Sequence, residues 1–174
     1  MELKILHSTL YNANLVSIPY WEYTKNLCKS YMFTEESKYE TKDPTDQHDW
    51  NKLTGIASHL FDSQKSSHMW AWRYYKGNFE VAPYSHNAAG DKILPTPEQI
   101  TIIPINTNFD TMIHLGGLDS GKVRFFVGYK DANDEVKMSK IYTANFLLPK
   151  KKYRVIQSWF GGDSLPKKSV KVYG

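Results

Sequence analysis

Cysteine is almost absent from this sequence, which carries one thiol, Cys28, in 174 residues. A single cysteine cannot form a disulfide within the chain, so nothing here requires an oxidising compartment. The lone thiol also excludes zinc sites built from several cysteines. Because it stands between Leu27 and Lys29, Cys28 is interpreted as a small core residue rather than a catalytic thiol.

Long apolar segments are missing as well. No apolar run approaches the ~18 residues of a membrane span. Residues 1–7 alternate charged and apolar side chains and lack the apolar stretch of a signal peptide. The sequence therefore predicts a protein made in the cytosol, without a signal peptide and without a membrane partner.

Motifs of known catalytic sites are also lacking. The six histidines show no HExxH spacing, and there is no G-x-S-x-G elbow, Walker loop or Rossmann fingerprint. The carboxylates are scattered, with no spacing that selects a glycosidase pair. We therefore expect no metal and no cofactor, and we leave enzymatic activity as the least favoured interpretation.

The charge is mildly basic, with a formal net charge of +4. Many of the lysines lie near the C-terminus, at positions 150–152 and 167–171. A solvated face accounts for such a cluster, and an acidic partner is the sharper alternative. No nucleic-acid-binding module pattern is present, so no specific nucleic acid is expected as a partner.

Aromatic residues and period-two alternation are abundant. Tyr, Phe and Trp make up 14% of the chain, and Lys122–Lys130 is the clearest alternating segment, with Val123, Phe125 and Val127 on one face. Segment 49–59 is instead predicted to form a short helix, because Leu53, Ile56 and Leu60 fall at helical spacing. Further strands are predicted at 3–10, 30–34, 69–75, 79–85, 99–105, 111–115, 135–142, 153–160 and 169–173.

These nine to ten short strands, separated by turn signals, predict an all-β fold. We expect residues 1–174 to form a single domain: a two-sheet antiparallel β-sandwich of the jelly-roll, concanavalin-like kind, with at most one or two short helices.

The densest polar and aromatic cluster lies at 67–75. In an extended strand, His68, Trp70 and Trp72 share one face, and Arg73 points to the other. The first face either fills the core or stacks on sugar rings. A partly buried Arg73 needs a carboxylate, and Asp49 is the predicted partner.

A second group is centred on Gly77, where a tight turn is predicted. His68 and His86 lie nearly symmetrically about this glycine and are predicted to face each other, with Tyr84 close by. Such a group could serve in acid–base chemistry, although many ordinary strand surfaces carry the same residues. The candidate glycan-binding or partner-binding residues are Asn51, His68, Trp70, Trp72, Arg73, Tyr84 and His86.

Three short motifs carry a resemblance to a known family. They are residues 48–56 (HDWNKLTGI), residues 68–74 (HMWAWRY) and residues 159–166 (WFGGDSLP), which precede a last predicted strand. In this order they resemble an uncharacterised protein family of gut Bacteroidetes and their phages, with the pattern D-x-N-K-L-F-G, W-R-Y and Y-F-G-G-N-x-x-A-P. The sequence departs from that pattern at Thr54, Ala71 and Leu165. The ending also resembles the close of concanavalin-like jelly rolls.

The resemblance implies a structural protein of a phage virion, such as a capsid decoration, head-fibre or tail-associated subunit. Its expected partners are other virion proteins in a homo- or hetero-oligomeric assembly, and its expected location is the virion. A carbohydrate-binding module is the alternative, with glycans as partners. A polysaccharide lyase or hydrolase using His68, Arg73, Tyr84 and His86 is the third.

Overall fold

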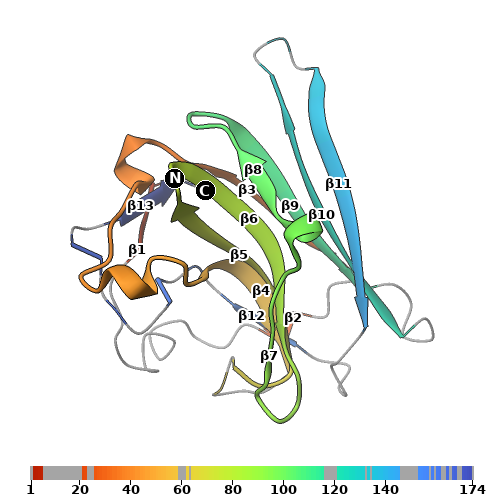
Figure 1. The fold of residues 1–174 in the computed structure, drawn as a ribbon. Helices are drawn as coiled ribbons and strands as arrows, with labels where there is room; N and C mark the ends of the chain where they lie inside the picture. The colour runs from red at the N-terminus through yellow and green to blue at the C-terminus, as the bar shows by residue number, and fades with distance from the viewer. Residues whose placement is uncertain are drawn as a thin grey trace.

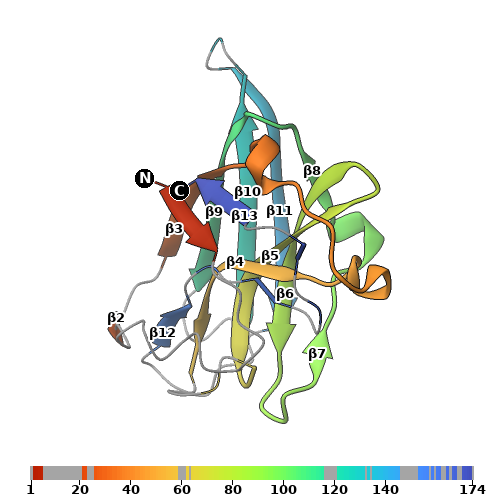
Figure 2. The ribbon, with the colours of Figure 1, turned by 90° about the vertical axis from the view of Figure 1, so that its left-hand side faces the viewer.

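The fold is a sandwich of two antiparallel β-sheets, as predicted. It is seen in a computed structural model (Figures 1 and 2). The structure describes residues 2–5, 21–22, 26–58, 62, 64–115, 121–131, 133, 135–145, 153–156, 158, 160–161, 164, 166–167 and 170–173. Side chains are described from residue 26 onward, except at 153 and 154. Parts of the predicted strand at 3–10 and of the motif at 159–166 lie outside these residues.

The first sheet has six strands in the order β1-β13-β3-β9-β10-β11. Their bounds are β1 Glu2–Ile5, β13 Val170–Tyr173, β3 Asn26–Met32, β9 Asn108–Leu115, β10 Lys122–Lys130 and β11 Val136–Asn145. The two ends of the chain are neighbours here, because β1 pairs with β13.

The second sheet has seven strands, in the order β2-β12-β4-β5-β6-β7, and β8 pairs with the part of β6 that β7 does not reach. Their bounds are β2 Trp21–Glu22, β12 Tyr153–Ile156, β4 Asn51–Ala57, β5 Ser67–Tyr75, β6 Asn78–His86, β7 Lys92–Ile93 and β8 Thr101–Ile103. Helical structure within the described residues is limited to three 3-10 turns, at Glu35–Ser37, Pro44–Asp46 and Pro97–Gln99.

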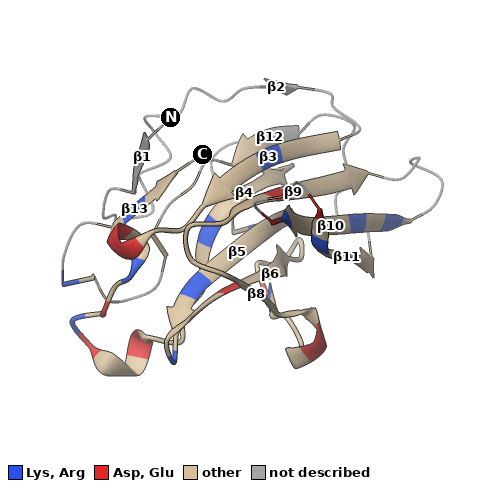
Figure 3. Cartoon of the chain, turned by 90° about the horizontal axis from the view of Figure 1, so that it is seen from above, with Lys and Arg blue, Asp and Glu red and all other residues tan. Residues whose placement is uncertain are grey.

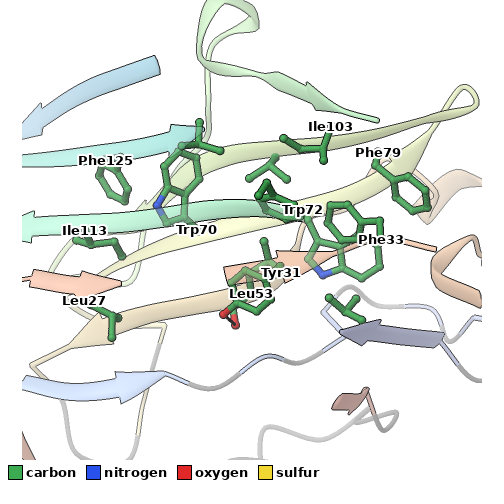
Figure 4. Packing of buried hydrophobic residues seen from close by; sticks show 14 of the residues in the cluster. Leu27, Tyr31, Phe33, Leu53, Trp70, Trp72, Phe79, Ile103, Ile113 and Phe125 are labelled. Carbon is green, nitrogen blue, oxygen red and sulfur yellow. Dashed lines mark hydrogen bonds between the residues drawn. The ribbon is translucent and has the colours of Figure 1, made fainter. Parts of the chain in front are cut away.

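The core between the sheets is largely aromatic (Figure 4). Trp70 and Trp72 on β5 point into it and are fully buried. Phe33 stacks on Phe79 with ring centroids 4.6 Å apart, and Trp70 meets Phe125 edge to face at 5.6 Å. Such pairs contribute beyond the burial of their area. Of the two alternatives left open for this face, the structure shows that both tryptophans fill the core.

The helix predicted at 49–59 is wrong, because residues 51–57 form strand β4. This strand lies between β12 and β5 and is buried along its whole length, so it shows no alternation of apolar and polar residues. The register shifts between Lys52 and Thr54, which marks a β-bulge. The extra residue places both Leu53 and Ile56 in the core, three positions apart, and so reproduces the spacing of a helix.

Candidate functional site

The predicted aromatic face of β5 is enclosed by the sandwich. His68, Trp70 and Trp72 are each 0% exposed. The indole Nε1 of Trp70 donates to the carbonyl of Met112 in the opposite sheet at 3.2 Å. In this structure these three side chains present no surface to a glycan or to a protein partner.

Asn51 is also fully buried, and its hydrogen bonds are internal. Its Nδ2 donates to the Tyr39 hydroxyl at 2.9 Å, and its Oδ1 accepts from the backbone N–H of Gly161 at 2.8 Å. The side chain thus ties β4 to two segments that are distant in the sequence. Its observed role is to hold these segments together.

His68 and His86 do not face each other, contrary to the prediction. The turn at Lys76 and Gly77 pairs Tyr75 with Asn78, so His68 lies opposite Ser85 and His86 lies opposite Ser67. The prediction centred the turn on Gly77, whereas the observed turn is centred between Lys76 and Gly77. A register shift of one residue moves a side chain to the other face of the sheet, so the two imidazoles lie on opposite faces.

Each histidine instead contacts a serine across the strand pair. His68 Nδ1 lies 2.8 Å from Ser85 Oγ, and His86 Nδ1 lies 3.1 Å from Ser67 Oγ. Burial lowers the pKa of His68 to about 4. Burial also lowers the pKa of His86 to about 4, with help from the nearby positive charges of Lys52 and Lys92. Both rings are therefore neutral at pH 7.

Arg73 lies on the outer face of β5, as predicted, but Asp49 is not its partner. Its Nε donates to Glu80 Oε2 at 2.7 Å, and its Nη1 donates to the carbonyl of His48 at 2.7 Å. Glu80 is the cross-strand neighbour of Arg73, so the sheet register makes this pair. The guanidinium also lies 4.3 Å from the Trp50 ring and 4.6 Å from the Tyr75 ring.

A buried polar group around Lys52 was missed by the sequence reasoning. The Nζ of Lys52 donates to the carbonyl of Trp50 at 2.7 Å and lies 4.8 Å from the ring of Tyr84. Burial, followed by the charge of Lys92, lowers the pKa of Lys52 to about 8. Burial raises the pKa of Tyr84 to about 12. Lys52 fell within the predicted helix and Tyr84 within a predicted strand, and no sequence pattern indicated that the two would be in contact.

An open groove lies on the outer face of the six-stranded sheet. Its volume is about 460 Å³, and it is lined by Cys28, Lys29, Ser30, Asp110, Thr111, Met112 and Phe126. The thiol of Cys28 is exposed, so its prediction as a core residue is wrong. Leu27 takes the inward position on β3, and the alternation of the strand turns Cys28 outward.

Five large apolar side chains of the described residues are exposed, and all lie on or next to strands at the ends of the two sheets: β7 and β8 in one sheet and β11 in the other. The hydroxyls of Thr101 on β8 and Tyr142 on β11 lie 2.8 Å apart and join the two sheets there. We call this the β8–β11 margin. It comprises the large exposed apolar residues of the described part of the chain: Ile93, Leu94, Ile102, Val136 and Ile141.

Searches against protein-family models, curated proteins and solved structures found no match to this chain. Within the described residues, no group of His, Cys, Asp or Glu could hold a metal ion. No helix among those residues is both long enough and apolar enough to cross a membrane.

Proposed function

We propose that this chain is a structural subunit of a phage particle, such as a capsid decoration, head-fibre or tail-associated protein, and that it acts by protein–protein contact. The observation that carries the proposal is the β8–β11 margin. Ile102 is 56% exposed, Val136 is 64% exposed and Ile141 is 65% exposed. Exposed apolar surface on strands at the ends of both sheets favours contact with a protein partner.

The backbone of β11 adds to this surface. β11 is a ten-residue strand at the end of its sheet, so one side of its backbone has no neighbouring strand among the residues that the structure describes. An unpaired edge can accept a strand from a partner. Lys137 and Lys140 on the same strand oppose indiscriminate pairing, because charged residues discourage edge-to-edge aggregation. The margin therefore favours one complementary partner in an assembly.

The internal bonding of the predicted polar residues also supports a role by contact. Asn51, His68 and His86 are buried and hydrogen-bonded within the sandwich. Arg73 is held by Glu80 and by a backbone carbonyl. These residues stabilise the fold, which leaves the outer surfaces to act.

The experiment is mass spectrometry of purified phage particles from a strain that encodes the chain. We expect the wild-type chain in the particles. We expect the double variant Ile102→Lys/Val136→Lys to compete at least about tenfold less well for incorporation, since it places charge in the contact. A matched control, Asn78→Lys/Ala88→Lys, adds the same charge at exposed turns and should incorporate normally. Particles that lack the wild-type chain would refute the proposal.

A further inference from the structure

We propose that the outer face of β3, β9 and β10 is a binding site for a neutral saccharide. This goes beyond the proposed structural role. The face adjoins β11 of the β8–β11 margin, because Phe126 pairs with Ile141, and it is centred on other strands. Antiparallel pairing arranges the side chains of this face in three parallel rows across the strands. Adjacent rows lie about 7 Å apart along each strand, which suits a ligand of one or two sugar rings.

The middle row is apolar. Cys28 pairs with Met112, and Met112 pairs with Phe126. The ring of Phe126 leans over Gly128, because a Cβ at that glycine would lie 3.1 Å from Phe126 Cζ. The missing side chain at 128 therefore allows the ring to lie along the sheet. A flat aromatic surface of this kind can stack on the C–H face of a sugar.

The second row supplies hydrogen-bond acceptors. Ser30 pairs with Asp110, and Ser30 Oγ donates to Asp110 Oδ1 at 2.5 Å. No lysine or arginine of the described residues forms a salt bridge with this carboxylate. Its remaining lone pairs face an open groove and can accept hydroxyl protons from a ligand. The side chain of Thr111 turns the other way and is buried, so Thr111 contributes backbone to the groove.

The third row supplies a donor through Arg124. Arg124 pairs with His114, and His114 pairs with Asn26. The Nδ1 of His114 lies 2.5 Å from Asn26 Oδ1; an amide oxygen only accepts, so Nδ1 is the donor. Arg124 is exposed and lies on the same face of β10 as Phe126. Its guanidinium can donate to ligand hydroxyl or ring oxygens.

The charges of the two outer rows select the class of ligand. Asp110 disfavours an anion such as a phosphate or a uronic acid. Lys29, which also lines the groove, and the exposed Arg124 disfavour a cation such as an amine. Hydroxyl groups both donate and accept, so a neutral sugar can satisfy both rows while its apolar face covers Phe126. Both signs of charge also appear on β9 and β10 in Figure 3.

The test is an NMR titration of the ¹⁵N-labelled chain with neutral hexasaccharides of glucose, xylose, mannose and galactose. A charged pair, oligogalacturonate and oligoglucosamine, serves as the comparison. We expect shifts in amides of β3, β9 and β10 with at least one neutral glycan, with a Kd of about 1 mM or tighter. Phe126→Ala should weaken binding about tenfold, whereas Phe126→Tyr should retain it. Asp110→Asn and Arg124→Gln should each weaken it several-fold.

Ile102→Ala on the β8–β11 margin is the matched control and should bind like the wild type. If Phe126→Ala does not fold, the amide map and Phe126→Tyr still locate the site. The proposal is overturned if no neutral glycan shifts the amides of these strands. It is equally overturned if only a charged oligomer binds, or if Asp110→Asn and Arg124→Gln leave the affinity unchanged.

Discussion

The outer faces of the two sheets differ sharply. The face of β4, β5 and β6 that points away from the core is itself buried: Met69, Ala71 and Ala82 are each 0% exposed and belong to a second hydrophobic cluster. The corresponding face of β3, β9 and β10 is open and holds the groove with Asp110 and Phe126. One sheet thus has two packed faces, and the other has only one.

This difference shows that the size of the side chains on each outer face matches whether other residues pack over that face. On the closed face, small residues such as Gly55, Ala57 and Ala71 allow close packing against Trp50 and its neighbours. On the open face, polar side chains alternate with the buried residues of the same strands. Changes on the closed face should therefore affect stability, and changes on the open face should affect binding.

The largest effect is expected for Gly55→Val. A Cβ at this position would lie 2.4 Å from Met69 Cγ and 2.6 Å from the carbonyl oxygen of His68, so the strands would have to separate. We expect a loss of about 3 kcal/mol in the free energy of unfolding, measured by urea denaturation. The control variant Ser139→Val also introduces a valine, but on the exposed strand β11, and should change the free energy of unfolding little. Equal losses in both variants would contradict the difference between the two faces.

A smaller loss is expected for Arg73→Ala. This change leaves the Glu80 carboxylate, only 14% exposed, without its partner and removes the contacts with Trp50 and Tyr75. We expect a cost of roughly 2 kcal/mol in the free energy of unfolding. Lys137→Ala on β11 breaks exposed ion pairs and should have no resolvable effect. A double-mutant cycle with Glu80→Ala that shows no coupling would contradict this role for the pair.

The pH dependence of stability provides a third test. The pKa of His68 is about 4 in the folded chain and 6.5 in its ordinary state, so the unfolded chain binds more protons between these values. Stability should therefore fall as the pH drops from 6.5 to 4, by roughly 2 kcal/mol from this residue. His68→Gln should reduce the slope measured by denaturation across this range. The exposed control His48→Gln should keep the wild-type slope, and an unchanged slope in His68→Gln would refute the assignment.

The smallest effect is expected from Lys52. Its pKa is lowered to about 8 in the folded chain against 10.5 ordinarily, so the unfolded chain binds more protons above pH 8. Stability should rise between pH 8 and 10 by roughly 1 kcal/mol, because the folded amine can lose its charge first. Lys52→Met should lack this rise, and the exposed control Lys140→Met should keep it. A rise that persists in Lys52→Met would mean that another group causes it.

Sequence patterns predicted the fold class and many of the strands. Alternation located the strand Lys122–Lys130, in which Val123, Phe125 and Val127 are buried as predicted. Alternation failed at β4, where both faces are covered and a bulge imitates the helical spacing. The prediction for Cys28 failed for another reason: it rested on the residue type and its neighbours, whereas the alternation of β3 turns Cys28 outward.

The candidate site was less predictable, because its residues meet across strands. The distance in sequence from Ser30 to Asp110 is eighty residues, and nothing in the local pattern joins them. The pairing of His68 with Ser85 depended on the register of one two-residue turn. A shift of a single residue in the expected turn moved His86 to the wrong face.

By itself, the sequence determined that this chain forms two layers of strands around an aromatic core, because alternation and composition are local properties. Only the tertiary structure decided which outer face is closed and which is open, and which partner each buried polar group receives. The physical reason is that contacts between segments far apart in the chain set the strand register and decide which outer face is buried. Such contacts produce no periodic pattern in the local sequence.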